Sequence, residues 1–245
     1  MGPSHLISIV GAGPGDPELL TVKAMNRLKN AQVILYDALI NQEILDLAPP
    51  KALKLYFGKL HNDGQDPQKR QDDIHHQLLY WAEQNQRIVR LKSGDPMVYS
   101  RGAEEISFCR RHKLNFEVIP GITAALAGAS LFTTPLTRRG KNSMVLFYTG
   151  RKNNCGYPQI ESVVNVLRTG SPVVIYMGLS HLVDLAECLI SHGIEQDIKI
   201  QIMCRISQKG QKIYRTTLGE VNDFMQNNTP ETPSIVMLGK NIDTI

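Results

Sequence analysis

The chain has 245 residues, of which 42% are hydrophobic and 20% are charged, and its formal net charge is +4. A chain of this length buries roughly 70–75% of its unfolded surface, and this composition is typical of a folded globular protein rather than a disordered one. No run approaches the roughly 20 apolar residues of a membrane helix, and residues 1–5 are too few and too polar for a signal peptide. We therefore expect a soluble cytoplasmic protein of one large or two small domains.

The spacing of the cysteines excludes further classes of protein, and the placement of the charges bears on the kind of ligand. No Cys-x-x-Cys pair occurs, which argues against a zinc ribbon and against a disulfide framework. Two stretches lack acidic residues, between Glu117 and Glu161 and between Asp197 and Glu220, and each carries five basic residues. Such a stretch suits an anionic ligand or is an ordinary solvated surface, and both interpretations stay open. The scattered cysteines, which we expect to be reduced and mostly structural, are Cys109, Cys155, Cys188 and Cys204.

Short β-rich runs alternate with amphipathic stretches along the first half of the chain. Strands are expected at residues 6–10, 32–36, 53–57, 87–91 and 116–119. Apolar residues recur at helical spacing in two of the stretches between them, at Ile74, Leu78, Leu79 and Ala82 and again at Ala103, Ile106 and Cys109. Alternating strands and helices predict a mostly parallel sheet that is covered on both faces.

The alternation is interrupted at Pro120-Gly121. A helix rich in Ala and Gly is expected over residues 122–131, and its small side chains allow another backbone or a ligand to approach closely. A second series follows, with strands at residues 144–148, 172–176, 198–203, 212–217 and 234–238 and a helix at 179–191. We expect a boundary near residues 120–140 and assign residues 1–120 and 121–245 to two α/β domains.

A glycine-rich loop, Gly11-Ala-Gly-Pro-Gly-Asp-Pro17, follows the first expected strand, where nucleotide-phosphate loops lie. Asp37 at the end of the second strand also suits a dinucleotide site. However, Asp16 stands where that fingerprint has its third glycine, and a carboxylate repels a pyrophosphate. Pro14 and Pro17 also remove amide donors. The loop therefore suits close backbone approach but not a pyrophosphate, and a plain strand-to-helix turn stays the alternative.

A second turn of the same kind, Ser93-Gly-Asp-Pro96, follows the fourth expected strand. In an open α/β sheet, ligands bind outside the carboxyl ends of the strands. Both Gly-Asp-Pro turns come at such ends, so we expect them to border one site.

Eight segments of the chain form a recognisable series. They are Gly11-Ala-Gly-Pro-Gly-Asp-Pro-Glu-Leu-Leu20, Val33-Ile-Leu-Tyr-Asp37, Gly58-Lys59, Arg90-Leu-Lys-Ser-Gly-Asp-Pro96, Arg101-Gly-Ala-Glu-Glu105, Pro120-Gly-Ile-Thr-Ala124, Pro135-Leu-Thr-Arg-Arg-Gly140 and Tyr176-Met-Gly-Leu179. In this order they resemble the tetrapyrrole methylases, which use S-adenosylmethionine, and the resemblance covers nearly the whole chain. The fifth and seventh segments are more specific to members that act on uroporphyrinogen III.

The resemblance implies an α/β protein with the two-domain tetrapyrrole methylase fold, an active cleft between the domains and a homodimeric assembly. It also implies S-adenosylmethionine as methyl donor and S-adenosylhomocysteine as product. This ligand carries no phosphate and its sulfonium is cationic, so the prolines and aspartates of the loops suit it. By motif position, the cofactor-binding residues would be Pro14, Ser93, Gly94, Asp95, Val98, Thr123, Ala124, Met177 and Ile206.

The reaction implied by the resemblance is the successive transfer of two methyl groups to ring carbons of uroporphyrinogen III, which yields precorrin-2 for sirohaem or cobalamin. Asp37 would be the proton acceptor and Lys59 a proton donor, and the alternatives are a turn carboxylate and an ordinary surface lysine. The substrate is a polycarboxylate, so Arg101, Arg138 and Arg139 are the expected clamps, because a guanidinium can bind a carboxylate bidentately. In a chain of this length, we expect no additional oxidase or chelatase domain.

The sequence departs from the family pattern at Ser93, Met97, Tyr99, Ser100 and Arg151. The second loop is somewhat nearer to that of methylases of later corrin precursors. A methylase that acts on a later precursor such as precorrin-4 is therefore the first alternative. A non-catalytic tetrapyrrole- or nucleotide-binding module is the second.

No metal site and no nucleic-acid surface are expected. His75 and His76 stand beside two aspartates, but consecutive residues point to different faces of a helix, and no third ligand is suitably spaced. We interpret the pair as part of a solvated helix. Nucleic-acid binding is disfavoured because the sequence has neither a long basic run nor an interleaved aromatic platform.

Overall fold

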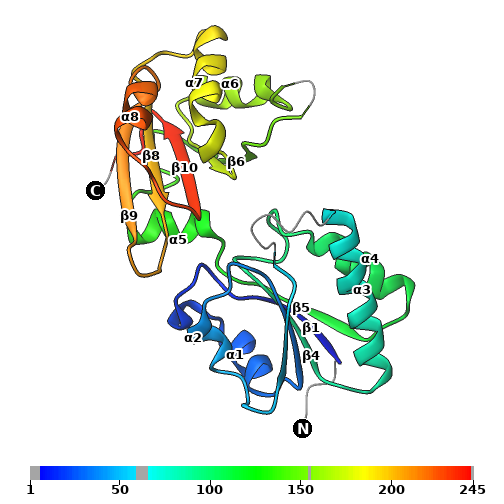
Figure 1. Cartoon of the computed structure of the whole chain (residues 1–245). Coiled ribbons are helices and arrows are strands. Elements are labelled where there is room, and N and C mark those ends of the chain that lie inside the picture. Colours follow the sequence, from blue (N-terminus) through cyan, green and yellow to red (C-terminus); the bar gives the residue numbers. More distant parts are fainter. Residues whose placement is uncertain (1–5, 59–65, 154–155, 244–245) are drawn as a thin grey trace. The chain divides into compact units, whose positions relative to one another are not determined.

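The computed structural model describes residues 6–58, 66–153 and 156–243 (Figure 1). The chain divides into two compact units, residues 1–123 and 124–245. Each unit is built around its own five-stranded sheet, with helices packed against it. The predicted α/β class is therefore confirmed. The sequence predicts a boundary near residues 120–140, with domains at residues 1–120 and 121–245, and these domains and the roles given to them stay predictions.

The first unit is a parallel sheet with helices on both faces (Figure 1). Its strands are β1 (Ile7–Gly11), β2 (Val33–Tyr36), β3 (Leu53–Tyr56), β4 (Ile88–Lys92) and β5 (Phe116–Ile119), in the order β3-β2-β4-β1-β5. The helices α1 (Val22–Lys29) and α2 (Gln42–Leu45) cover one face. The helices α3 (Pro67–Glu83) and α4 (Gly102–Arg111) cover the other face. The parallel sheet expected for this half of the chain is confirmed.

Alternate residues of the strands enter two separate cores. Ile9 and Ile88 pack with α3 and α4, whereas Val10, Val89 and Leu91 pack with α1 and α2. Successive side chains of a strand point to opposite faces, so a strand that is covered on both sides needs an almost continuous apolar run. This explains why the sequence pattern of these strands is easy to recognise.

Several helices of this unit begin at residues whose side chains cap them. Thr21 Oγ1 accepts a hydrogen bond from Ala24 N at 3.1 Å at the start of α1. Asn41 and Asp66 accept from backbone amides in the same way at the starts of α2 and α3. A short 3-10 helix, η1 (Pro17–Leu19), precedes α1 and is capped by Asp16. Such caps satisfy amides that have no partner within the helix.

The connections leave β1 and β4 toward opposite faces of the sheet. β1 leads to α1 and β4 leads to α4, yet the two strands are neighbours, with Gly11 opposite Lys92. The chain therefore leaves the two neighbouring strands in opposite directions beyond the loops at their carboxyl ends. In open α/β sheets, such a switch point is where ligands bind. The topology thus selects the loops after β1 and β4 for the candidate site.

The second unit holds a mixed sheet in the order β6-β7-β10-β8-β9. β6 (Leu146–Thr149) and β7 (Val173–Tyr176) run parallel, whereas β8 (Lys199–Cys204), β9 (Lys212–Thr217) and β10 (Ser234–Gly239) pair antiparallel with their neighbours. The mostly parallel arrangement expected from the first half does not extend to this sheet. The reason is that only a short loop joins β8 to β9, and a parallel pair needs a long crossover.

Helices also cover both faces of the second sheet. The helices α6 (Ile160–Arg168), α7 (Leu182–Ser191) and α8 (Val221–Asn227) contribute to one core, and a short 3-10 helix, η2 (Leu179–His181), precedes α7. The helix α5 (Ala124–Leu131) packs against the other face. There, a Cβ atom on Gly128 would stand 2.9 Å from Met203 Sδ and 2.9 Å from Ile206 Cδ1. The small residues of α5 therefore allow the close approach that the sequence predicts.

His75 corrects one prediction, because it is buried rather than solvated. Its ring stacks on Phe108, with ring centroids 4.3 Å apart, and its Nε2 lies 3.2 Å from Gln71 Nε2. His76, on another face of α3, is exposed. The two residues do point to different faces, but only one of these faces is solvated. Burial lowers the pKa of His75.

Two further observations concern the cysteines and the apolar character of the helices. The thiols of Cys109, Cys188 and Cys204 are free, and Cys155 lies outside the described residues. Among the helices that the structure describes, none combines the length and apolar character that crossing a bilayer requires.

Candidate functional site

Three glycine loops meet at the carboxyl ends of β1, β4 and β5. Gly94 N donates to Gly13 O at 2.8 Å, and Gly13 N donates to Gly94 O at 3.2 Å. A Cβ atom on Gly11 would stand 2.5 Å from Gly121 N, and one on Gly121 would stand 2.2 Å from Gly94 O. No side chain tolerates such distances, so Gly11 and Gly121 are required here. We call the meeting of residues 11–15, 93–95 and 120–123 the glycine junction.

Asp95 fastens the glycine junction. Its Oδ1 accepts a hydrogen bond from Met97 N at 2.8 Å, and its Oδ2 accepts one from Gly121 N at 3.0 Å. One carboxylate thus ties the loop after β4 to the loop after β5. Asp95 therefore holds its own turn, and it also orders the neighbouring loop.

Six of the nine predicted cofactor residues belong to the first unit and lie at or beside the glycine junction. Pro14 and Thr123 are buried, whereas Ser93 and Val98 are half-buried. Thr123 Cα lies 3.7 Å from the position of a Cβ atom on Gly94. The structure brings this part of the predicted set together, although its contact with a cofactor stays a prediction. The six residues are Pro14, Ser93, Gly94, Asp95, Val98 and Thr123.

The other three predicted cofactor residues, Ala124, Met177 and Ile206, belong to the second unit and lie around α5. Ala125 N donates to Tyr176 Oη at 3.3 Å, which places the first turn of α5 beside the end of β7. Ile206 packs against the same helix at Gly128. Met177 is 40% exposed and has a φ of 55°, a left-handed conformation that is uncommon outside glycine and often marks functional sites.

The chemistry of the glycine junction suits a ligand without phosphate. Pro14 has no N–H group, and the amides of Gly13, Gly94 and Gly121 already donate within the junction. Asp95 adds a negative charge. A phosphate needs free amide donors or cations, whereas carbonyl groups and a carboxylate suit a neutral or cationic ligand.

A buried group of four charged side chains lies next to the glycine junction, at the carboxyl ends of β2 and β4. Arg90 Nη2 donates to Asp37 Oδ1 at 2.5 Å, and Arg90 Nε donates to Glu105 Oε1 at 2.9 Å. Lys92 Nζ donates to the same Glu105 oxygen at 2.8 Å and lies 4.0 Å from Asp37 Oδ2. The side chains of Arg90, Lys92 and Glu105 are 2%, 1% and 0% exposed, whereas that of Asp37 is 30% exposed. We call these four residues the charged tetrad.

The strand geometry of β4 explains the tetrad. Residues i and i+2 of a strand share a face, so Arg90 and Lys92 point to the same side of the sheet. That side is covered by α4, where Glu105 is fully buried. Sequence reasoning named Asp37 but assigned no role to the other three. The signal that it missed was an Arg-x-Lys pair within a strand of otherwise apolar residues, followed by two acidic residues early in the next helix.

The charges of the tetrad stabilise one another. Burial alone would raise the pKa of Glu105, but the charges of Arg90 and Lys92 outweigh burial and lower it. Burial lowers the pKa of Lys92, as does the charge of Arg90, while Glu105 and Asp37 act in the opposite direction. Burial also acts to lower the pKa of Arg90, but the two carboxylates outweigh it and raise that pKa. Two cations and two anions give zero formal charge, which is how buried charges are tolerated.

Comparison with known proteins decides the family. The family model described as tetrapyrrole (corrin/porphyrin) methylases matches residues 6–222. The chain belongs to the tetrapyrrole methylases. The family that the sequence resembles is therefore confirmed.

Several curated proteins are similar to this methylase over most of its length. It is 36% identical to the chloroplastic S-adenosyl-L-methionine-dependent uroporphyrinogen III methyltransferase of Arabidopsis thaliana, covering 97% of this chain and 63% of that protein. It is 36% identical to a uroporphyrinogen-III C-methyltransferase of Sinorhizobium sp, covering 95% and 82%. It is 39% identical to a siroheme synthase of Psychrobacter arcticus, covering 95% and 42%. The chain spans less than two thirds of the length of most of the curated relatives it matches.

Solved structures share the fold of this methylase. The native form of uroporphyrin III C-methyl transferase from Thermus thermophilus is 36% identical, with a TM-score of 0.81 over 96% of this chain and 98% of that chain. The Thermus enzyme complexed with S-adenyl homocysteine is 35% identical, with a TM-score of 0.79 over 95% and 91%. A cobalt precorrin-4 methyltransferase is 24% identical, with a TM-score of 0.84 over 97% and 95%, and it shows the fold alone. The predicted methylase fold is confirmed.

The arginines expected to clamp carboxylates have different surroundings in this methylase. In the first unit, Arg101 donates from Nε and Nη2 to the carboxylate of Glu104, at 2.8 and 2.6 Å. In the second unit, Arg138 Nη2 donates to the backbone carbonyl of Asp243 at 2.8 Å. Arg139 is exposed and has no ion pair with another described residue. Lys59, the predicted proton donor, lies outside the described residues.

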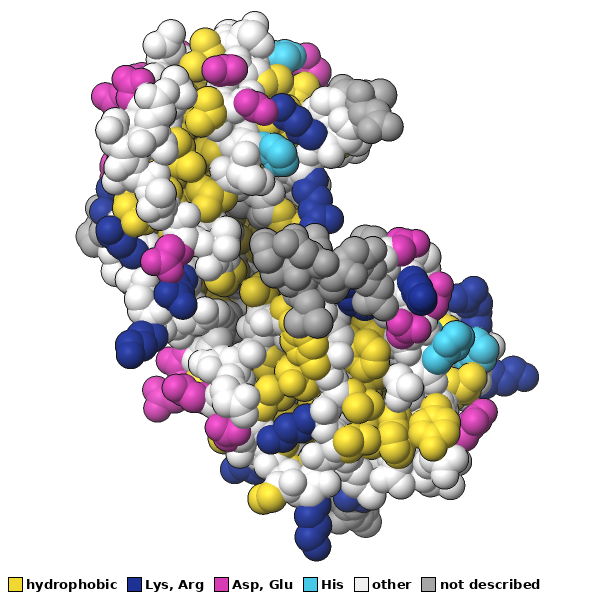
Figure 2. All heavy atoms as spheres, viewed as in Figure 1, with side chains coloured by type: hydrophobic (Ala, Val, Ile, Leu, Met, Phe, Trp, Pro, Cys, Tyr) yellow, Lys and Arg dark blue, Asp and Glu magenta, His cyan; other side chains and the backbone are white. Residues whose placement is uncertain are grey.

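Basic residues of the two acid-free stretches form ion pairs with acidic residues from other parts of the chain. The pairs are Lys152 with Asp184, Lys199 Nζ with Asp243 Oδ1 at 2.5 Å, and Arg205 Nη1 with Glu231 Oε2 at 2.8 Å. On the face drawn in Figure 2, Lys and Arg side chains are scattered among other types rather than gathered in one patch. Part of the local positive charge expected from the sequence is thus offset within the fold.

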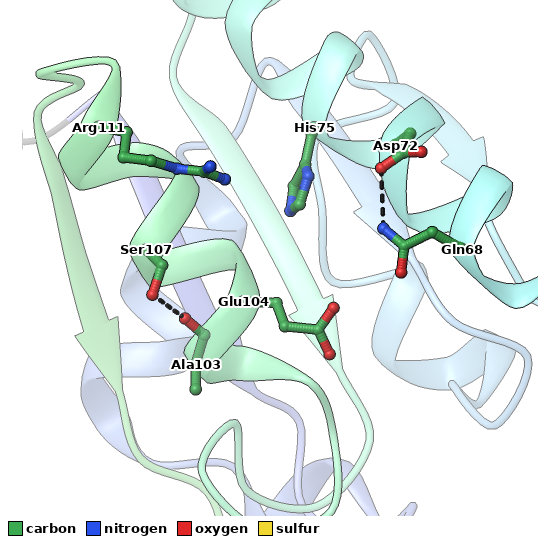
Figure 3. A pocket seen from close by; sticks show the side chains of 7 residues that line it. All are labelled: Gln68, Asp72, His75, Ala103, Glu104, Ser107 and Arg111. Carbon is green, nitrogen blue, oxygen red and sulfur yellow. Dashed lines mark hydrogen bonds between the residues drawn. The ribbon is translucent and has the colours of Figure 1, made fainter.

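A pocket lies between α3 and α4, on the same face of the first sheet as Glu105 (Figure 3). Gln68 Nε2 donates to Asp72 Oδ1 at 3.0 Å, and Gln68 Oε1 accepts from Arg101 Nη2 at 3.1 Å. Glu104, which also lines the pocket, binds the same arginine. Two residues that line the pocket, Gln68 and Glu104, therefore bind Arg101. None of the lining residues belongs to the glycine junction. These residues are Gln68, Asp72, His75, Ala103, Glu104, Ser107 and Arg111.

Proposed function

We propose that the chain is a methyltransferase that uses S-adenosylmethionine to methylate two ring carbons of uroporphyrinogen III in succession, giving precorrin-2 for sirohaem or cobalamin. The observation that carries the proposal is the position of Asp37. It is the one partly exposed member of the charged tetrad, next to the glycine junction, in a chain 36% identical to named uroporphyrinogen III methyltransferases.

The glycine junction supports the choice of methyl donor. When bound, S-adenosylmethionine supplies a methyl group on a positively charged sulfur. The carbonyl groups of the loops and the carboxylate of Asp95 suit that charge, and the shortage of free amide donors disfavours a nucleotide phosphate. The residues that would hold the donor are Pro14, Ser93, Gly94, Asp95, Val98 and Thr123 from the first unit and Ala124, Met177 and Ile206 from the second.

Asp37 is suited to the proton transfer that methylation of a ring carbon requires. When a ring carbon takes the methyl group from the sulfonium, the macrocycle becomes positively charged and must then lose a proton, which a carboxylate can accept. Arg90 fixes one oxygen of Asp37 at 2.5 Å, so the orientation of the carboxylate is set before any ligand binds. Lys59 as a proton donor belongs to the proposal through the family motif alone.

The substrate's carboxylates would be bound by Arg101, Arg138 and Arg139. Arg139 is exposed and can meet a substrate carboxylate without giving up an acidic partner among the described residues. Arg101 is already bound by Glu104, so it would exchange or share that partner. Methylation of a later corrin precursor such as precorrin-4 is the second candidate, favoured by the departures from the family pattern at Ser93 and Ser100.

A homodimer, which the family resemblance implies, and a cytoplasmic location complete the proposal. Light scattering of the purified protein measures the first directly. A mass of two chains is expected, and a mass of one chain would remove the dimer from the proposal.

The decisive experiment incubates the chain anaerobically with uroporphyrinogen III and methyl-labelled S-adenosylmethionine, and reads the products by mass. Two added methyl groups per macrocycle are expected. For Asp37→Asn we expect turnover to fall by about 10²-fold or more, with the affinity for S-adenosylhomocysteine unchanged by calorimetry. Asp46→Asn is the matched control, because Asp46 is an exposed carboxylate at the end of α2.

Two outcomes would contradict the proposal. No methylated product from uroporphyrinogen III, with retained binding of S-adenosylhomocysteine, would overturn the substrate and favour a later precursor. Full turnover by Asp37→Asn would remove Asp37 as the proton acceptor.

A further inference from the structure

The pocket between α3 and α4 belongs neither to the glycine junction nor to the charged tetrad. Its volume is about 530 Å³, which lies in the range of small-molecule sites. The space between two packed helices is normally filled by apolar side chains. This pocket is lined mainly by polar and charged side chains instead, so it suits a polar ligand better than an apolar one.

His75 gives the pocket a fixed hydrogen-bond donor. Of the residues that line the pocket, only His75 is buried, and its ring is held by the stack on Phe108. The nitrogen of the Gln71 amide, 3.2 Å from His75 Nε2, can only donate, so Nε2 accepts and Nδ1 carries the ring proton. Nδ1 has no hydrogen-bond partner among the residues that the structure describes. Its N–H group is therefore left for a ligand.

The two sides of the pocket carry opposite charges. In Figure 3, Arg111 from α4 and Asp72 from α3 lie on opposite sides of His75, and both interact with it electrostatically. Neither forms an ion pair within the described part of the chain, and Asp72 Oδ1 accepts only the amide of Gln68, at 3.0 Å. Glu104 differs, because Arg101 already offsets its charge. The pocket thus offers a cation on one side and an anion on the other.

We propose that this pocket binds a small zwitterion, a molecule with a carboxylate at one end and an ammonium group at the other. The carboxylate binds the guanidinium of Arg111, whose planar donors match it, and accepts the N–H of His75. The ammonium group binds the carboxylate of Asp72. A ligand of one charge alone would satisfy only one side of the pocket. The inference goes beyond methyl transfer and does not depend on it.

Both charged residues also have structural roles that the test must separate from binding. Arg111 lies in the last turn of α4, where a cation interacts favourably with the helix dipole. Asp72 accepts a hydrogen bond from Gln68, one turn earlier in α3. Loss of these roles would change the stability of the fold, whereas loss of a ligand site changes the affinity for a probe.

The probes are ω-amino acids in which the two charges lie progressively further apart, namely β-alanine, 4-aminobutyrate and 6-aminohexanoate. Butylamine and butyrate carry one charge each and are the matched controls. Binding is followed by nitrogen NMR of the His75 ring and of the Ser107 backbone amide, since both residues line the pocket. We expect at least one ω-amino acid to bind with a Kd of about 1 mM. Both singly charged probes should bind about tenfold more weakly or less.

Three variants locate the probe through the Ser107 signal. Arg111→Met and Asp72→Asn each remove one charge and should weaken binding by about tenfold. His75→Phe keeps an aromatic ring to stack on Phe108 but removes the N–H donor, so it should also weaken binding. Each variant is first shown to be folded by its amide spectrum.

Two further variants are matched controls from the same helices. Arg110→Met and Glu83→Gln remove exposed charges of α4 and α3 that do not line the pocket, and they should leave the affinity unchanged. Saturation with S-adenosylhomocysteine should also leave it unchanged, because the pocket shares no residue with the glycine junction. Competition between the two would place the probe elsewhere and overturn the inference.

The remaining outcomes are equally decisive. No shift with any ω-amino acid at about 20 mM, well above the expected Kd, would overturn the site. Equal binding of butylamine or of butyrate would overturn the zwitterionic class of ligand. Unchanged affinity in both Arg111→Met and Asp72→Asn would show that the probe does not bind between them. None of these measurements involves methylation, so they stand whether or not uroporphyrinogen III is the substrate.

Discussion

Glu105 and Glu117 are buried on opposite faces of the same parallel sheet, and each binds two basic side chains. Glu117 binds Lys23 Nζ at 2.7 Å, Arg27 and the hydroxyl of Ser8 at 3.0 Å. The side chains of Lys23 and Arg27 are 53% and 23% exposed. The two cations that bind Glu105 are almost completely buried. We call Ser8, Lys23, Arg27 and Glu117 the Glu117 cluster.

The two clusters differ in the partners of the glutamate oxygens and in the exposure of the cations to solvent. In the Glu117 cluster, both carboxylate oxygens have partners and the cations reach water, where solvent screens their charges. In the charged tetrad, one oxygen of Glu105 has no partner in the described part of the chain, and charge balance requires a second carboxylate, Asp37. The Glu117 cluster therefore fastens α1 to the sheet, whereas the tetrad connects the core to a partly exposed acid beside the glycine junction.

The largest expected effect comes from removing the buried arginine of the tetrad. Arg90→Met leaves two carboxylates with one cation in the core, so we expect the free energy of unfolding to fall by about 3–5 kcal/mol. The matching change in the other cluster, Arg27→Met, leaves Glu117 with Lys23 and Ser8 and should cost about 1–2 kcal/mol. Urea unfolding at pH 7 measures both. Equal losses would show that burial does not separate the two clusters.

The strands of the first sheet could be predicted from the sequence because each is a local run of apolar residues. The runs around Ile9 and Val89 are apolar on both faces, and the loops after them carry the glycines that a close approach needs. Even so, the close approach of Gly11 to Gly121 could not be predicted, because these residues meet only when β1 and β5 pair.

The charged tetrad was less predictable than the glycine loops. Arg90 and Lys92 alternate with apolar residues in β4, and such alternation in a single sequence indicates a strand with one solvated face. Only the packing of α4 shows that this face is covered, and only Glu105 makes that burial possible. The error at His75 has the same origin, since the neighbour that buries it, Phe108, lies on another helix.

The second expected effect concerns acid stability and belongs to the Glu117 cluster. Burial alone would raise the pKa of Glu117, but hydrogen bonds from Arg27, Lys23 and Ser8 outweigh it and lower the pKa from 4.5 to about 2. A carboxyl whose pKa is lower in the folded state stabilises the fold above its unfolded pKa, and this stabilisation is lost as the pH falls through the folded pKa. The contribution of Glu117 should thus be complete at neutral pH and disappear between about pH 4.5 and 2.

Glu117→Gln tests this contribution directly. We expect it to lower the free energy of unfolding by about 2 kcal/mol at pH 7, after allowance for the solvent around Lys23, and to converge with the wild type near pH 2. Urea unfolding at intervals between these pH values gives the comparison. A loss that stays constant down to pH 2 would assign the effect to packing rather than to charge.

The smallest expected effect distinguishes an exposed cation from a buried one. Lys23 is 53% exposed, so Lys23→Met should cost about 0.5 kcal/mol at low ionic strength, and most of this loss should vanish in about 1 M salt, where the Debye length is about 3 Å. Lys92 is 1% exposed, and the loss caused by Lys92→Met should persist at that salt concentration because ions do not reach the pair. The free energy of unfolding of both variants, measured at low and at high salt, therefore shows whether solvent enters the tetrad. A loss at Lys92 that salt abolishes would mean that it does, and the ion pairs of Lys92 would then be screened like those of Lys23.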